Sequence, residues 1–163
     1  MTVINGLPAH ALLLHLVVVL VPLTALLEIL CGLWPAARRG QLLWLTLVLA
    51  TVTMVLTPIT INAGQWLYDL RTKPSPILRE HAERGTTMVY FSGALLAVAI
   101  GLVVLRLIER RPERRRMVTH VVAGIIVLVV GIASMVQVYR TGDAGAQSVW
   151  GGEIARLKKS NGT

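Results

Sequence analysis

The apolar residues of this chain gather in four long stretches, and nearly every charged residue lies between these stretches or after the last one. They cover roughly residues 7–34, 42–62, 86–108 and 117–139. Each is close to, or longer than, the ~20 apolar residues that an α-helix needs to cross a hydrocarbon core of about 30 Å. Runs such as LLLHLVVVLVPL leave no polar face, unlike the amphipathic helices of soluble proteins. The pattern therefore predicts four membrane-spanning helices.

The fold class follows from these spans. The four stretches and their short connections use most of the 163 residues, so we expect an all-α, integral membrane four-helix bundle that forms one domain over residues 1–163. The composition agrees, with 55% hydrophobic residues and a mean hydropathy of +0.68. The lipid bilayer is the expected environment, and a homo-oligomer or a larger membrane complex is a further expected assembly.

The segment after the fourth stretch, residues 140–163, is rich in glycine. Its glycines predict the end of the spanning helix and a turn-rich extramembrane tail. We expect Asp143 to cap a short helix in this tail through its carboxylate. The neighbouring Val149 and Trp150 would give that helix an apolar face, which lies on the membrane surface or over the mouth of the bundle.

The formal net charge of +8 is explained by membrane topology and not by nucleic-acid binding, because the excess of Lys and Arg lies beside the apolar stretches. The connection RLIERRPERRRM over residues 106–117 is the densest cationic segment and should be cytoplasmic. No Lys or Arg precedes the first stretch, and Arg38 and Arg39 follow it. We therefore expect an integral membrane protein with both termini outside the cytoplasm.

Small and weakly polar residues recur at helical spacing on three of the stretches, and such residues mark packed faces between helices in lipid. The predicted faces are Thr46, Ala50, Thr53, Thr57, Thr60 and Gly64 on the second stretch, Gly93, Ala97 and Gly101 on the third, and His120, Gly124, Gly131 and Ser134 on the fourth.

Three of the four histidines, His10, His15 and His81, fall on the side that we expect to face outward. Neutral imidazole is a good ligand for haem iron and other metals. Two histidines on different helices can hold a haem from both faces, and His15 with His81 is the favoured pair. His10 and His15 lie about 140° apart around an ideal helix, so they do not share one ion unless His10 precedes the regular helix and bends back.

Two glutamates beside His81, at positions 80 and 83, make a small acidic cluster in a segment that its prolines predict to be a rigid loop. The cluster could hold a divalent metal. Ion pairs between these glutamates and Arg79 and Arg84 in a solvated loop are the favoured interpretation.

A second pair of ionisable residues is expected deeper in the bundle. Glu28 lies about two turns before the inner end of the first span, and His120 lies one turn into the fourth span from the same side. A hydrogen bond between them would lower the cost of burying both groups. Alternatively, each reaches the inner membrane surface separately.

The chain carries no catalytic signature that would define an enzyme. It has no Cys-x-x-Cys-His, His-Glu-x-x-His, phosphate-binding loop or Gly-x-Ser-x-Gly, and its single Cys31 excludes an intramolecular disulfide. The favoured function is a non-enzymatic accessory or ligand-binding bundle. The alternatives are a haem-b electron-transfer protein that uses the outward histidines, and a transporter or proton path through Glu28 and His120.

Three segments together resemble an uncharacterised bacterial family, the domain of unknown function 2231, in its actinobacterial type. They are Leu7–His15, with its two histidines, Arg79–His81, and Thr141–Ala146 before Val149 and Trp150. The resemblance implies a small four-helix membrane protein with paired histidines at the start of the first helix and a Gly-rich segment after the fourth. It also implies that relatives carry His where this chain has Asp143.

Overall fold

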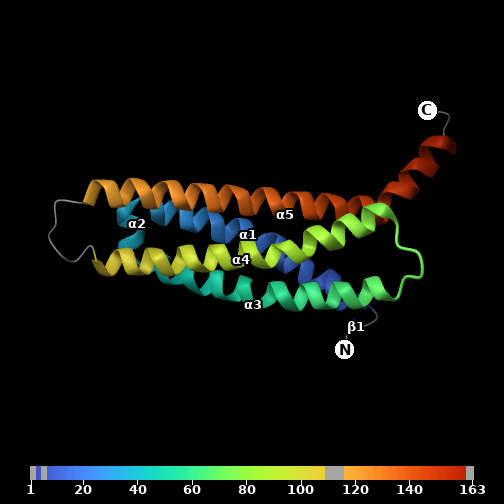
Figure 1. Cartoon of the computed structure of the whole chain (residues 1–163), viewed down its shortest axis with the longest axis horizontal. Helices are drawn as coiled ribbons and strands as arrows, with labels where there is room; N and C mark the ends of the chain where they lie inside the picture. Colours follow the sequence, from blue (N-terminus) through green and yellow to red (C-terminus); the bar gives the residue numbers. More distant parts are fainter. Residues whose placement is uncertain (1–2, 5–6, 109–115, 161–163) are drawn as a thin grey trace.

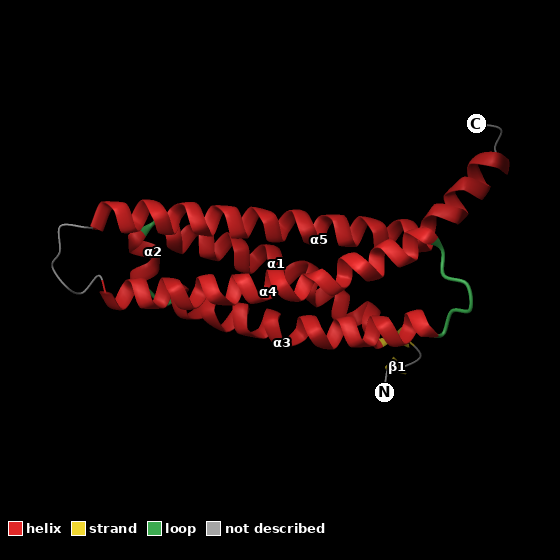
Figure 2. Ribbon diagram, in the orientation of Figure 1, coloured by secondary structure: helices red, strands yellow, loops and turns green. Residues whose placement is uncertain are grey.

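The computed structural model describes residues 3–4, 7–108 and 116–160. Four long helices make up almost all of this part (Figure 2). They are α1 (Ala9–Leu33), α3 (Leu42–Asp69), α4 (Pro76–Ile108) and α5 (Arg116–Ser160). The short helix α2 (Pro35–Arg39) joins α1 to α3, and the two-residue strands β1 (Val3–Ile4) and β2 (Leu7–Pro8) pair in antiparallel fashion before α1.

The long helices pack side by side, and each runs opposite to the one before it in the chain (Figure 1). Both α1 and α4 pack against α3 and α5, and α1 also touches α4 across the centre. All four are long and apolar enough to cross a membrane. The predicted four-span bundle is thereby confirmed. We name its two ends: α1 and α4 begin at the histidine end, and α2 lies at the opposite, arginine end.

The packed face of α3 is the threonine stripe that the sequence predicts. Thr46, Ala50, Thr53, Thr57 and Thr60 are all buried. Each of these threonine hydroxyls donates to a carbonyl one turn back in its own helix, so burial leaves no hydroxyl unsatisfied. Of the face predicted for α5, Gly124, Gly131 and Ser134 are buried and His120 is half-buried. These small residues let α5 approach α1 closely.

The predicted face of α4 is wrong. Gly93 is half-buried, and Ala97 and Gly101 are exposed. The buried positions are instead Met88, Ser92, Leu95, Ala99, Leu102 and Leu105. Since α3 and α5 turn small residues to the centre, larger side chains from α4 are needed to fill it at the density of a protein interior. Leu102, for example, packs with Cys31, Leu43 and Val127 in one core cluster.

The expected Gly-rich tail with its own short helix is also wrong, because α5 runs without interruption to Ser160. Asp143 lies within α5, where it accepts a hydrogen bond from Gln147 Nε2 at 2.9 Å, and it caps no helix start. Each glycine costs about 1 kcal/mol of helix propensity, but burial of Thr141 and Ala144 against the bundle offsets this cost. Beyond them the helix swings away from the bundle, and Trp150 is exposed there (Figure 1).

Helix α4 begins ten residues earlier than the expected span, at Pro76 and not at residue 86. The segment expected to be a rigid loop is therefore the first turns of a helix. Proline is well suited to the first position of a helix, where its missing N–H has no intrahelical partner. Ser75 stands before it, and its hydroxyl accepts a hydrogen bond from the backbone N–H of Leu78 at 3.2 Å.

Candidate functional site

A cavity of about 350 Å³ lies among the four long helices at the histidine end. We call it the histidine cavity. Most of its walls are apolar, and Arg71 is the one side chain with a fixed charge among the described residues that line it. The lining residues that matter below are His10, Thr57, Thr60, Gly64, Arg71, His81, Thr141 and Gly145.

Two imidazoles face each other in this cavity. The ring centres of His10, from α1, and His81, from α4, are 6.2 Å apart, and their planes are inclined at 77°. His10 Nδ1 donates to Thr60 O at 3.0 Å, and His81 Nδ1 donates to Thr141 O at 2.9 Å. A carbonyl oxygen only accepts, so in each ring the proton is on Nδ1 and the Nε2 lone pair is available to a ligand.

Each imidazole lies against a glycine of a neighbouring helix. A Cβ at Gly64 would come within 2.7 Å of the His10 ring, and a Cβ at Gly145 would come within 2.9 Å of the His81 ring. Both distances are far below normal van der Waals contact. Glycine at these two positions therefore lets the Nδ1–Cε1 edge of each ring come close to α3 or α5 and reach a backbone carbonyl of the preceding turn.

The predicted pairing of His15 with His81 does not occur. His15 is exposed, its Nδ1 bonds to Ala11 O of its own helix, and it does not line the histidine cavity. His10 takes the place opposite His81. The expectation that His10 might precede the regular helix is also wrong, because α1 begins at Ala9 and His10 is already in its first turn.

The acidic residues near His81 are engaged in ion pairs along α4. Glu83 bonds to Arg79 at 3.1 Å, and Glu80 pairs with Arg84. This confirms the ion pairs that the sequence favours at these positions. Within residues 9–108 and 117–160, no group of three or more His, Cys, Asp or Glu side chains is placed to hold a metal ion.

The hydrogen bond expected between Glu28 and His120 is not formed. Both carboxylate oxygens of Glu28 are fully buried and have no hydrogen-bond partner in the described part of the chain. His120 Nδ1 instead lies 3.0 Å from Arg38 Nη2. The two residues share the arginine half of the bundle, as predicted, but Arg38 is the partner of the imidazole.

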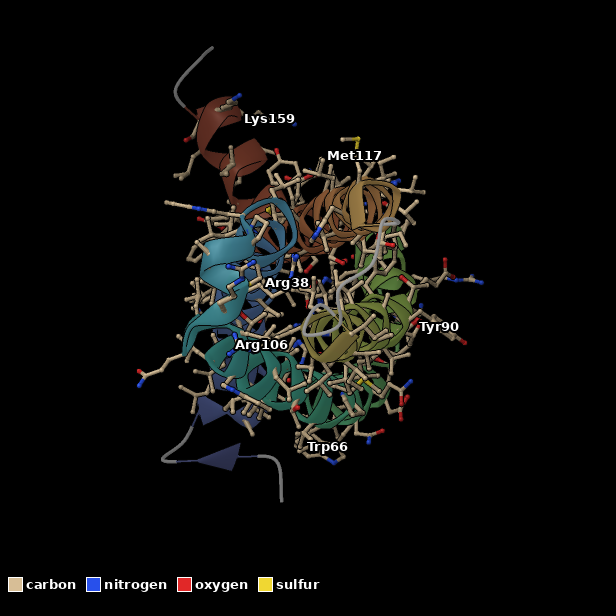
Figure 3. The ribbon with its side chains drawn as sticks, turned by 90° about the vertical axis from the view of Figure 1, so that its left-hand side faces the viewer. Arg38, Trp66, Tyr90, Arg106, Met117 and Lys159 are labelled. Atoms are coloured by element: carbon tan, nitrogen blue, oxygen red, sulfur yellow. The ribbon has the colours of Figure 1, made fainter. Side chains whose placement is uncertain are left out.

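Arg38 was expected only to set topology, but its side chain is fully buried at the arginine end (Figure 3). Its Nη1 donates to Cys31 O at 2.7 Å and to Gly32 O at 3.3 Å, which satisfies carbonyls at the end of α1. Arg106 Nη1 donates in turn to Arg38 O at 2.6 Å. Arg38 lies in the short connection between two apolar stretches, and nothing in the sequence there indicates that this arginine turns inward.

Sequence reasoning also missed the two backbone segments that hold the imidazoles. Thr60–Gly64 reads Thr-Ile-Asn-Ala-Gly, and Thr141–Gly145 reads Thr-Gly-Asp-Ala-Gly. Comparing the residues at the end of the second apolar stretch with those that follow the fourth would have found this shared Thr-x-Asn/Asp-Ala-Gly pattern.

Comparison with known proteins identifies one family. The family model described as "Predicted membrane protein (DUF2231)" matches residues 6–157, which is almost the whole chain. No curated protein and no solved structure matches the chain. The matched region includes every residue of the histidine cavity.

Proposed function

The chain belongs to the DUF2231 family of predicted membrane proteins, and from the geometry of the histidine cavity we propose that it binds one b-type haem, with His10 and His81 as the two axial ligands. The observation that carries this proposal is the pair of facing imidazoles, each with its Nδ1 on a backbone carbonyl. Such a hydrogen bond fixes the ring orientation and raises the basicity of a metal-binding histidine.

The separation of the two rings fits an iron ion between them. Two metal–nitrogen bonds of about 2 Å each, with about 1 Å from each nitrogen to its ring centre, place two axial imidazoles about 6 Å apart. The rings of His10 and His81 are 6.2 Å apart. This is the ring separation that two imidazoles bound to one haem iron would have.

Haem suits the cavity better than a bare metal ion. The described residues supply two facing imidazoles and no third protein ligand, whereas a porphyrin supplies four nitrogens of its own. The mostly apolar walls of the cavity suit a macrocycle. Arg71 follows the end of α3 and lines the cavity, where its guanidinium offers a cation for a haem propionate.

Two histidine ligands leave no open coordination position on the iron, and this favours electron transfer over oxygen or substrate chemistry.

We further propose that the protein lies in the bacterial cytoplasmic membrane with the histidine end outside the cytoplasm. The dense cationic segment between the third and fourth spans supports this orientation, since such segments are retained on the cytoplasmic side.

The test is the absorption spectrum of the protein purified in detergent from haem-replete cells. We expect a Soret band and, after reduction with dithionite, the sharp α-band of six-coordinate haem b. His10→Ala and His81→Ala should each remove most of the bound haem, because each deletes one of two axial ligands. His15→Ala is the matched control, since His15 is on the same helix as His10 but outside the cavity.

A colourless wild-type protein that also fails to bind added haemin would contradict the proposal. Equal haem loss from His15→Ala and His10→Ala would contradict the assignment of the ligands, because only one of the two lines the cavity.

A further inference from the structure

The helices α3 and α5 bury the same positions in the same order. The six buried residues of α3 are Leu43, Thr46, Ala50, Thr53, Thr57 and Thr60. At the position 81 residues later in each case, α5 buries Gly124, Val127, Gly131, Ser134, Val138 and Thr141. It also buries Ala144, whose counterpart Ala63 is half-buried. Most of these pairs differ in residue type, so the shared property is the face that each helix turns to the centre.

The helices α1 and α4 correspond in the same way with a shift of 71 residues. Five buried positions match, since Val17, Val21, Thr24, Glu28 and Cys31 of α1 correspond to Met88, Ser92, Leu95, Ala99 and Leu102 of α4. The remaining buried residues, Ala9, Ala25 and Gly32 of α1 and Leu105 of α4, have no buried counterpart. The same shift carries His10 onto His81. The bundle thus consists of two helical hairpins, α1–α3 and α4–α5, with equivalent buried positions.

The packing of the hairpins places a pseudo-two-fold axis along the bundle. Within the hairpins, α1 packs on α3 and α4 packs on α5; between them, α1 packs on α5 and α4 packs on α3. The helices α1 and α4 touch across the centre and both begin at the histidine end (Figure 1). An axis between α1 and α4 exchanges the two hairpins, as in membrane proteins built from parallel repeats.

The histidine cavity contains two equivalent half-sites around this axis. In one, His10 of α1 donates to Thr60 O of α3 and lies against Gly64. In the other, His81 of α4 donates to Thr141 O of α5 and lies against Gly145. Both glycines end the same Thr-x-Asn/Asp-Ala-Gly segment.

We propose that the histidine cavity is a two-fold site, in which Gly64 and Gly145 are equivalent positioning residues and a haem iron bound there lies on the pseudo-two-fold axis. The position of the iron rests on the proposed function; the equivalence of the half-sites does not. The two imidazoles then ligate the iron to the same extent, and the haem plane contains the axis and stands along the membrane normal.

Equivalence of the half-sites is tested on the full-length, haem-free protein, by 15N NMR after labelling with 15N-histidine. We expect His10 and His81 to show the same Nδ1–H tautomer. Gly64→Ala should shift only the His10 signals, and Gly145→Ala only the His81 signals, because each new methyl group displaces one ring. Gly142→Ala is the matched control on α5, since a Cβ there meets nothing within 4 Å.

The position of the iron is tested by titration with haemin, using His10→Ala and His81→Ala, which remove atoms and introduce no clash. Their dissociation constants should rise by the same factor to within about threefold, which corresponds to about 0.7 kcal/mol. Thermal unfolding of each variant checks that the bundle is intact.

The outcomes separate the two proposals. The two-fold site is overturned if Gly64→Ala shifts the His10 signals but Gly145→Ala does not shift those of His81. It is also overturned if the haemin dissociation constants of His10→Ala and His81→Ala differ by more than about tenfold. Symmetric imidazole signals without any haemin binding support the two-fold arrangement of the half-sites and overturn the haem proposal alone.

Discussion

Among the described residues, Arg38 and Glu28 are the two ionisable side chains that are fully buried in the arginine half of the bundle, and the free-energy cost of burial differs between them. Arg38 is fully buried, and its guanidinium bonds to Cys31 O, Gly32 O and His120. Glu28 is equally buried, but its carboxyl oxygens bond to nothing in the described part of the chain. A buried polar group without a hydrogen bond lowers stability by about 1–3 kcal/mol.

Glu28→Met should therefore raise the free energy of unfolding by about 1–3 kcal/mol, because methionine fills a similar volume without polar atoms. Thermal unfolding in detergent measures the change. Glu80→Gln, at an exposed position of α4, is the control and should change little. A clear loss of stability in Glu28→Met would instead show that the carboxyl has a favourable partner in the folded protein.

At the scale of the helices, close approach depends on where glycine faces a neighbour. A Cβ at Gly131 of α5 would lie 2.9 Å from Ile29 Cδ1 of α1. A Cβ at Gly101 of α4 would meet nothing within 4 Å. The same residue type thus has opposite roles at the two positions: one permits the α1–α5 contact, and the other only weakens its own helix.

Gly131→Ala should accordingly lower the free energy of unfolding by about 1–3 kcal/mol, because the new methyl group overpacks the contact with Ile29. Gly101→Ala should raise it by up to about 1 kcal/mol through helix propensity. Denaturation of both variants in one detergent gives the comparison. Equal effects of the two substitutions would contradict the helix packing described above.

The whole molecule is a four-helix bundle. Both described ends of the chain lie at its histidine end, and so does the connection between α3 and α4 (Figure 1). Side chains such as Val19, Val129 and Ile132 are exposed along its length, as a protein solvated by lipid requires. Among the described residues, Arg38 and Arg106 meet at the opposite end.

The proposed orientation predicts which positions a membrane-impermeant maleimide reaches in intact cells. In a Cys31→Ala background, Thr72→Cys and Ser160→Cys should be labelled directly, because both positions are at the histidine end. Gln41→Cys, at the arginine end, should be labelled only after permeabilisation. Direct labelling at Gln41 alone would reverse the orientation.

The features that the sequence predicted correctly are those that depend on the residues of a single helix. The threonine face of α3 was found because small, weakly polar residues at helical spacing mark packed faces in lipid. The stripe of Gly93, Ala97 and Gly101 was misassigned because small residues are tolerated on either face. At the site, His81 was identified but was paired with His15. The position of a histidine in α1 does not show which face of the helix meets α4.

Hydropathy alone determined that the solvent is a bilayer and that the chain crosses it four times, because a hydrocarbon core of about 30 Å demands apolar runs of that length. It fixed neither the neighbours of each helix nor the direction of its polar side chains. Those depended on packing between helices. The approach of α1 to α4 placed His10 opposite His81, Arg38 turned inward to the carbonyls that end α1, and burial of Thr141 and Ala144 carried α5 through its glycines. Contacts between helices that are distant in the chain determine these side-chain directions and helix neighbours. The periodicity of residues within one helix contains no information about such contacts.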